Sequence, residues 1–400
     1  MQPPVVPALS PPSPAVTSLY VHVPFCAAKC DYCAFYSEAA SGAVVNRYVA
    51  ALVRELELVA ADLKPETVFF GGGTPSLLNL RQWEQVLDAM QRLNLLGAAE
   101  WTVECNPATV SLDKARLLKS AGVNRLSMGV QSLHAPLLER LGRVHTREMV
   151  FSSFDTLRKA GFDNVNLDLM FAIPGQTLEM WRETLAEATA MGSEHLSSYE
   201  VTYEEDTPLF SQLQAGEVRE DEDLACAMYE KLVQRAADAG FVQYEVSNFA
   251  RDDASARSAP SSRLPSLACR HNVNYWRGGS FYGLGPSATS YVRGVRTKNW
   301  SNTPLYCEQL ENGRRAVESR EELPPLARAG ETAAFGLRMV AGWPFDQFRG
   351  ITGHDLRTEW ADDMARLCDQ GWGRRTAQRF RLTPQGLRFA DAAARLFLRP

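Results

Sequence analysis

The 400-residue sequence contains no apolar run of the roughly 20 residues that a membrane-spanning helix needs. Lysine and arginine are missing from the first 18 residues, which therefore match neither a secretory signal nor an arginine-rich transit peptide. A basic surplus is missing too: 42 Lys and Arg face 47 Asp and Glu, which leaves a net charge of −5 and no basic field to attract nucleic acid. We therefore expect a cytoplasmic protein with no integral membrane segment and no nucleic-acid partner.

Cysteine is scarce, with eight residues in the chain, and without an export signal these are expected to be reduced thiols. Three of them form a Cys-x3-Cys-x2-Cys run: Cys26, Cys30 and Cys33. Three thiolates are one fewer than a closed zinc or iron–sulfur site usually takes. A cube of four irons on this run would keep one iron open to another ligand. The alternatives are a zinc knuckle without a nearby fourth ligand, or three unrelated buried thiols.

Short apolar strands alternate with longer amphipathic segments from Ser18 to about Phe249. This alternation predicts a parallel sheet with helices outside, as a partial (β/α)6 barrel or, alternatively, a doubly wound open sheet. In three segments the end of a predicted helix is followed by Ala-Gly and then by a predicted strand. The glycines of these segments are expected to adopt the left-handed conformation that ends a helix. The strands are expected at 18–23, 67–70, 100–105, 124–130, 164–170 and 195–201.

Composition divides the rest of the chain. Residues 1–17 are proline-rich and predict a disordered lead-in, and 18–250 form the α/β core. A Ser/Ala/Arg/Pro-rich tract at 251–268 predicts a flexible insertion. Residues 269–400 predict a smaller α+β C-terminal domain, whose end reads as strand, turn and helix, as in a winged-helix-like unit.

Polar and glycine residues gather where the predicted strands end. The cysteine run follows the first strand, and Gly71-Gly72-Gly73-Thr74-Pro75 follows the second. In α/β barrels this face carries the active site, and glycine lets backbone amides approach a ligand closely. A plain tight turn is the alternative for the glycines. Further polar side chains lie on or after the later strands, and together they predict a ligand-binding site at this end of the sheet. Taken singly, each could instead form a salt bridge or a helix cap. These residues are Glu104, Gln131, Arg143 and Asp168.

An ordered set of motifs resembles the coproporphyrinogen-oxidase-like branch of the radical S-adenosylmethionine (SAM) superfamily over residues 17–400: YVHVPFCAAKCDYCAF, GGGTPS, ECNP, NRLSMGVQS, LGRVH and NLDLMFAIPGQT. The resemblance implies a radical SAM barrel with a 4Fe-4S cluster on the three cysteines. It also implies a set of residues that contact SAM. This set comprises Tyr20, Gly72, Gly73, Thr74, Glu104, Gln131, Arg143 and Asp168, with Tyr32 as a further candidate.

Two kinds of protein share these motifs. The oxygen-independent coproporphyrinogen III dehydrogenase carries a longer N-terminal segment and another cysteine two positions after the third. Here only 19 residues precede Tyr20, and position 35 is Phe35. The sequence instead resembles the HemW-type haem chaperones, which implies a protein that passes haem to acceptor proteins, among them membrane-bound respiratory proteins. The dehydrogenase and a module with a vestigial site remain the alternatives, so enzymatic activity is left open.

A second motif, Arg270-His271-Asn272-Val273-Asn274-Tyr275-Trp276-Arg277, resembles the His-Asn-x-x-Tyr sequence of the haem-chaperone branch. The resemblance implies that His271 and Tyr275 bind haem, since imidazole is a standard axial ligand of haem iron. Arg270 or Arg277 could then meet the haem propionates. The alternative is that His271 only pins a turn between the sheet and the C-terminal region.

Overall fold

The computed structural model describes residues 15–39, 41–252 and 264–399. The predicted lead-in at 1–17 and the predicted insertion at 251–268 therefore lie largely outside the described residues. Among the described helices, none is long and apolar enough to cross a membrane.

The core of the fold is a nine-stranded sheet in the order β11-β1-β4-β5-β6-β7-β8-β10-β9. Seven of these strands run parallel, and in the six that come first in the sequence each strand pairs with the next one along the chain. A doubly wound sheet would reverse its order midway, so the partial barrel is confirmed and the alternative is wrong. The six are β1 (Val16–Val23), β4 (Leu63–Gly72), β5 (Glu100–Cys105), β6 (Arg125–Gln131), β7 (Val165–Phe171) and β8 (His195–Glu200).

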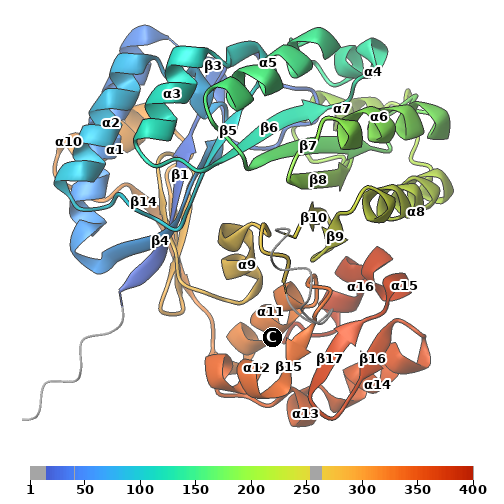
Figure 1. Ribbon diagram of the computed structural model, residues 1–400. Coiled ribbons are helices and arrows are strands. Elements are labelled where there is room, and N and C mark those ends of the chain that lie inside the picture. The colour runs from blue at the N-terminus through green and yellow to red at the C-terminus, as the bar shows by residue number, and fades with distance from the viewer. Residues whose placement is uncertain (1–14, 40, 253–263, 400) are drawn as a thin grey trace, which may run out of the picture.

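Helices between these strands cover the convex side of the sheet (Figure 1). Their apolar faces bury large side chains against the strands, and Trp83 and Trp181 are fully buried. The glycines of the Ala-Gly repeat, Gly122, Gly161 and Gly240, have φ of +104°, +90° and +82°, which confirms the predicted helix ends. The helices are α1 (Gly42–Val59), α2 (Leu80–Arg92), α3 (Leu112–Ser120), α4 (Ala135–Arg140), α5 (Arg147–Lys159), α6 (Leu178–Ala190), α7 (Pro208–Gln214) and α8 (Glu222–Asp238).

The chain then completes both edges of the sheet. Strands β10 (Asn248–Ala250) and β9 (Val242–Gln243) continue it antiparallel beyond β8, and β11 (Tyr282–Leu284) pairs parallel with β1. After β11, a separate sheet and a helix pack beside β1 and α1, and Tyr306 joins the main apolar core. Helix α9 (Arg270–Trp276) precedes β11, and the elements after it are β12 (Thr289–Val292), β13 (Val295–Asn299), α10 (Thr303–Glu311) and β14 (Val317–Glu322).

The last part of the chain forms a lobe with its own apolar core, coloured orange to red in Figure 1. Its end has the predicted strand, turn and helix, although the helical stretch is split at Phe389. The elements of the lobe are α11 (Pro325–Gly336), β15 (Trp343–Pro344), α12 (Phe345–Thr352), α13 (Leu356–Glu359), α14 (Ala361–Asp369), β16 (Gly373–Arg375), β17 (Arg379–Leu382), α15 (Pro384–Arg388) and α16 (Ala390–Arg395).

Candidate functional site

The carboxyl ends of the parallel strands bring the polar residues of the motifs to one end of the barrel. Tyr20 lies on β1, Gly72 ends β4 and Glu104 lies on β5. Gln131 ends β6, and Asp168 lies in β7, paired in register with Gly129 of β6. Parallel strands end at the same edge, which explains why residues more than 140 positions apart in the sequence meet there.

The three cysteines lie in the loop after β1, which begins with the short strand β2 (Phe25–Cys26) and ends at β3 (Glu38–Ala39). The Thr74 hydroxyl donates to Cys26 Sγ at 3.6 Å, and Arg143 Nη1 donates to Cys30 Sγ at 3.5 Å. Burial raises the pKa of the Cys33 thiol, and repulsion from Cys30 and Cys26 adds to the effect. The loop therefore holds three thiols close enough to repel one another, with a guanidinium beside them.

These thiols suit a multi-iron cluster better than a single ion. All three are free and half-buried. Within the described ranges, no three His, Cys, Asp or Glu side chains converge tightly enough to hold one metal ion. In a cubane each thiolate binds a different iron, so its ligands stand farther apart than those of one zinc ion. The donor set thus fits a 4Fe-4S cluster.

The glycine loop after β4 forms a backbone cradle. A Cβ on Gly73 would lie 2.6 Å from the Val23 carbonyl oxygen and 2.8 Å from the Phe25 nitrogen, both backbone atoms that cannot move aside cheaply. Gly72 has φ of +97°, and a Cβ there would overlap the His22 ring. The glycines are therefore required by close backbone approach to the cysteine loop, which fits a ligand-holding turn.

Two carboxyl groups face each other inside the barrel mouth. Glu104 Oε2 accepts the Gly72 amide at 3.1 Å, and burial together with the Asp168 charge raises the pKa of Glu104 to about 8. Burial also raises the pKa of Asp168, which is opposed by hydrogen bonds from Ser127 at 2.9 Å and Asn166 at 2.8 Å. The charge of Arg125 lowers both pKa values, but neither acid forms an ion pair among the described residues, and such an arrangement favours a positively charged ligand.

The remaining predicted SAM contacts divide into two groups. Gln131 has φ of +63°, and its amide lies with the Arg143 guanidinium beside Gly129, whose carbonyl accepts from Arg143 Nη2 at 2.7 Å. Tyr32 instead packs in a small apolar cluster with residues such as Leu141, and burial raises its pKa well above the usual range. Gln131 and Arg143 therefore face the site, whereas Tyr32 belongs to its wall.

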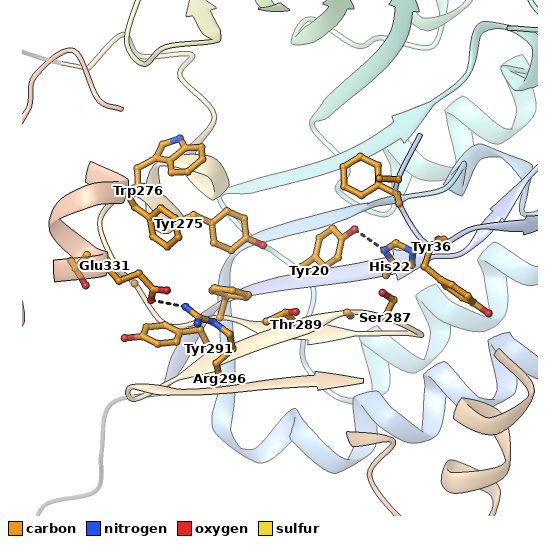
Figure 2. A pocket seen from close by; sticks show the side chains of 18 residues that line it. Tyr20, His22, Tyr36, Tyr275, Trp276, Ser287, Thr289, Tyr291, Arg296 and Glu331 are labelled. Atoms are coloured by element: carbon orange, nitrogen blue, oxygen red, sulfur yellow. Dashed lines mark hydrogen bonds and ion pairs between the residues drawn. The ribbon is translucent and has the colours of Figure 1, made fainter. Parts of the chain in front are cut away.

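A cavity of about 730 Å³ adjoins this end of the barrel (Figure 2). Its walls combine the residues after Cys33 with β12, β13 and α11, and Tyr20 of the barrel also lines it. Its size lies in the range of pockets that enclose drug-sized ligands. Eight of its 18 lining residues are aromatic: Tyr20, Phe35, Tyr36, Tyr275, Trp276, Phe281, Tyr291 and Phe335.

Of the residues in the second motif, Tyr275 lines the cavity but His271 does not. His271 is 1% exposed, and its ring nitrogens meet the Thr67 hydroxyl at 3.0 Å and the Tyr275 hydroxyl at 2.9 Å. Both nitrogens already have partners, so this geometry favours the pinning role over direct contact with an iron. Arg277 donates to the Gly342 carbonyl at 2.8 Å outside the cavity lining.

Sequence reasoning did not find the charged residues of the cavity, Arg296 and Glu331. Arg296 and Glu331 form an ion pair at 2.5 Å across it, although 35 positions separate them in the sequence. His22 and Tyr36 lie at the opposite end in Figure 2. No local pattern marks Arg296, because it lies on an ordinary antiparallel strand.

Residues 20–188 match the profile of the Radical SAM superfamily, and residues 323–389 match the HemN C-terminal domain. A relative from Lactococcus lactis, named heme chaperone HemW, is 31% identical over 95% of this chain and 97% of its own length. The heme chaperone HemW of Escherichia coli is 33% identical over 95% of this chain and 98% of its own length.

Among solved structures, the radical SAM enzyme coproporphyrinogen III oxidase (HemN) of Escherichia coli superposes with a TM-score of 0.80. It is 20% identical and covers 96% of this chain and 90% of that chain, which shows a shared fold. Both the barrel and the C-terminal lobe are therefore common to the two proteins. On the extent of its identity to the curated relatives, this chain belongs to the HemW haem chaperone family of the radical SAM superfamily.

Proposed function

We propose that this protein binds haem and passes it to an acceptor protein, while carrying a 4Fe-4S cluster and SAM. The cavity is the observation that carries the proposal. It is large and aromatic, and it opens beside the cysteine loop, since Ala34, Phe35 and Tyr36 directly follow Cys33 and line it. A planar apolar macrocycle gains most of its binding free energy from contact with such aromatic walls.

Cys26, Cys30 and Cys33 would hold the cluster, and the open iron would take SAM. The bound pair supplies a source of single electrons next to a sulfonium. The glycine loop at Gly72, Gly73 and Thr74 would position the ligand through its backbone. The deprotonated Glu104 would accept from the amino group of SAM, which fits a buried carboxyl that forms no ion pair among the described residues. Gln131, Arg143, Asp168 and Tyr20 would complete the contacts, with Tyr32 as a wall.

Tyr275 would face haem directly, because its ring lines the cavity. His271 would act through the hydrogen bond that fixes the Tyr275 hydroxyl at 2.9 Å. This assignment replaces the expectation that His271 is itself the axial ligand. Haem is the cargo in this proposal, and its acceptors, among them membrane-bound respiratory proteins, are the partners.

A haem titration of the reconstituted protein tests the proposal. Haem should produce a saturable shift of the Soret band. Phe335→Ala should weaken binding by roughly tenfold, because Phe335 lines the cavity and its loss removes apolar contact area. Phe335 is 44% exposed in the protein without haem, so the fold should tolerate the change.

Phe389→Ala is the matched control, since Phe389 is 38% exposed on the C-terminal lobe and does not line the cavity. It should bind haem as the wild type does. A wild-type protein without saturable binding would contradict the proposed function. Equal weakening by both substitutions would show that the cavity is not the haem site.

The second candidate function is dehydrogenation of coproporphyrinogen III. It is favoured by Tyr20, a proposed SAM contact that also lines the cavity and would therefore bring a cavity ligand beside SAM. Anaerobic incubation with coproporphyrinogen III, SAM and a reductant separates the two functions. We expect no protoporphyrinogen, and sustained turnover would favour the enzyme.

A further inference from the structure

The cavity has a single permanent cation. Arg296 of β13 is the only lysine or arginine among the described residues that line it. His22 also lines it, but burial lowers the pKa of this imidazole, so it is neutral near pH 7. An anionic group on a ligand in the cavity therefore has one permanently charged side chain, Arg296, with which to form an ion pair.

Two carboxylates share this guanidinium. Arg296 Nη2 lies 2.5 Å from Glu331 Oε2, and Arg296 Nη1 contacts Glu321. These three side chains carry two negative charges against one positive charge, and Arg328, which does not line the cavity, lies beside them in a small adjoining pocket. Glu321 lies on β14, with 51% of its side chain exposed, whereas Glu331 lies on α11, is 21% exposed and lines the cavity.

We propose that Arg296 is the residue that recognises a carboxylate of the bound tetrapyrrole, and that this carboxylate displaces Glu331. This inference rests on the proposed function and adds a determinant of specificity to it. A third carboxylate on the same guanidinium would raise the repulsion further, so one acid must leave. Glu331 is the acid inside the cavity, and it holds the position that a propionate would take.

The geometry supports an edge-on carboxylate contact. Figure 2 shows Arg296 and Glu331 at one end of the cavity, with His22 and Tyr36 at the other end and aromatic rings between them. The Arg296 guanidinium lies 6.0 Å from the centre of the Tyr291 ring, which also lines the cavity. A planar ligand lying along these rings would therefore direct an acidic edge toward Arg296.

The test compares haem with haem dimethyl ester, in which both propionates are neutral. Arg296→Met should weaken haem binding by roughly tenfold and leave the affinity for the ester unchanged, because only the free acid uses the guanidinium. Glu331→Gln should strengthen haem binding and leave the ester unchanged, because the competing carboxylate is removed. Retained ester binding also shows that each variant is folded.

Arg320→Gln is the control. Arg320 lies on β14, is 61% exposed, pairs with Glu322 at 2.9 Å and does not line the cavity, so neither ligand should respond. Equal loss of haem and ester in Arg296→Met, or loss of neither, would overturn the inference while the haem function stood. Weaker haem binding in Glu331→Gln would overturn the displacement of Glu331. Failure of the wild type to bind haem would instead remove the proposed function itself.

Discussion

At the scale of single residues, the site is marked by two buried acids whose pKa values are raised although the charge of Arg125 opposes the shift. Glu104 accepts one hydrogen bond from the Gly72 amide and has a carboxyl neighbour in Asp168, with no ion pair of its own among the described residues. The raised pKa of both acids is the expected cost of building a site for a cationic ligand. The raised pKa of Glu104 makes the stability of the protein depend on pH when SAM is not bound.

The pKa of Glu104 is about 8 in the folded protein against its usual 4.5. Between these values the folded chain holds a proton that the unfolded chain has lost, so stability falls as pH rises from about 4.5 to about 8. Glu104→Gln keeps an acceptor for the Gly72 amide but removes the titration. It should raise the free energy of unfolding at pH 8.5 by on the order of 2 kcal/mol after solvent screening.

Chemical denaturation without SAM, at pH 5 and pH 8.5, checks this expectation. The wild type should lose stability across the interval more steeply than Glu104→Gln. Parallel pH profiles for the two proteins would show that Glu104 ionises normally. Addition of SAM should reduce the difference between them, because a cationic ligand stabilises the carboxylate.

At the scale of elements, one buried acid holds the later segments against the first helix. Glu55 of α1 is 1% exposed and accepts hydrogen bonds from the Gly285 amide at 2.8 Å, Asn299 Nδ2 at 2.7 Å and the Tyr306 hydroxyl at 2.7 Å. The three donors follow β11, end β13 and lie on α10 respectively. Glu55 thereby positions the segment that forms one wall of the cavity.

Glu55→Ala leaves three buried donors without an acceptor and should lower the free energy of unfolding by about 3 kcal/mol or more. Tyr306→Phe removes one donor and keeps the ring, so it should cost only about 1 kcal/mol. Urea denaturation of both variants measures the two values. Equal losses would mean that the Tyr306 hydrogen bond accounts for the whole contribution of Glu55, and that its bonds to Gly285 and Asn299 add nothing.

Elements that depend on interactions between residues close in the sequence could be predicted, whereas features that depend on distant residues could not. The strand–helix alternation and the left-handed Gly122, Gly161 and Gly240 depend on neighbours within a few residues, and these predictions were confirmed. The motif around His271 was harder to interpret. Its histidine is hydrogen-bonded to Thr67 of β4, which lies 204 positions away, so no local pattern could show that both ring nitrogens are engaged.

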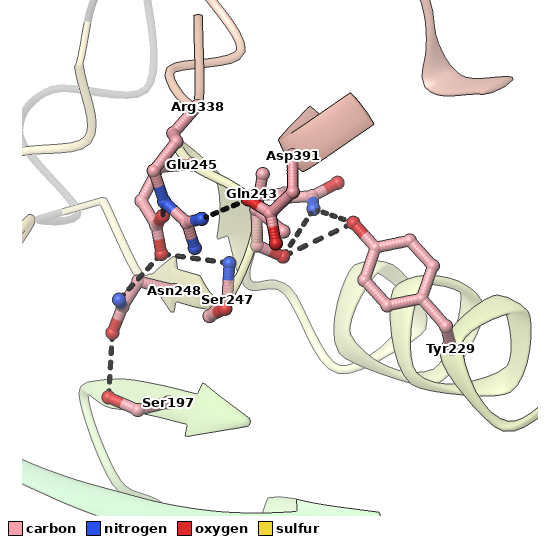
Figure 3. A network of polar contacts seen from close by, with 9 residues as sticks. Ser197, Tyr229, Gln243, Glu245, Ser247, Asn248, Arg338 and Asp391 are labelled. Atoms are coloured by element: carbon pink, nitrogen blue, oxygen red, sulfur yellow. Dashed lines mark hydrogen bonds and ion pairs between the residues drawn. The ribbon is translucent and has the colours of Figure 1, made fainter. Parts of the chain in front are cut away.

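At the scale of the whole molecule, a buried polar network joins the barrel to the C-terminal lobe (Figure 3). Glu245 is fully buried, and its Oε1 accepts from the Ser247 amide at 2.8 Å and Asn248 Nδ2 at 2.6 Å. Arg338, which follows α11, lies 3.6 Å from the other oxygen of Glu245 and 3.2 Å from Asp391 of α16. The network sits where β9 and β10 meet the lobe.

Glu245→Ala should destabilise the protein by about 2 kcal/mol, because it leaves the buried donors of Ser247 and Asn248 without an acceptor and removes the carboxylate beside Arg338. Glu230→Gln is the matched control. Its pair with Arg388, at 2.6 Å, also joins the barrel to the lobe, but the Glu230 side chain is 60% exposed. The control should cost less than about 1 kcal/mol.

Thermal unfolding of the two variants, followed by circular dichroism, measures the difference. A separate early transition in Glu245→Ala would show that the lobe unfolds before the barrel. If the two substitutions have equal effects, burial of the network contributes nothing to the junction.

The sequence alone determined the chemistry of the barrel mouth. The spacing of Cys26, Cys30 and Cys33, the glycine loop and the order of strand-end polar residues are local features, and parallel strands necessarily bring their carboxyl ends together. Only the tertiary structure decided which residues form the cavity in which we propose that haem binds. The cavity joins residues of the cysteine loop, β13 and α11, so the meeting of Arg296 with Glu331 depends on how the lobe packs against the barrel, which no short stretch of sequence encodes.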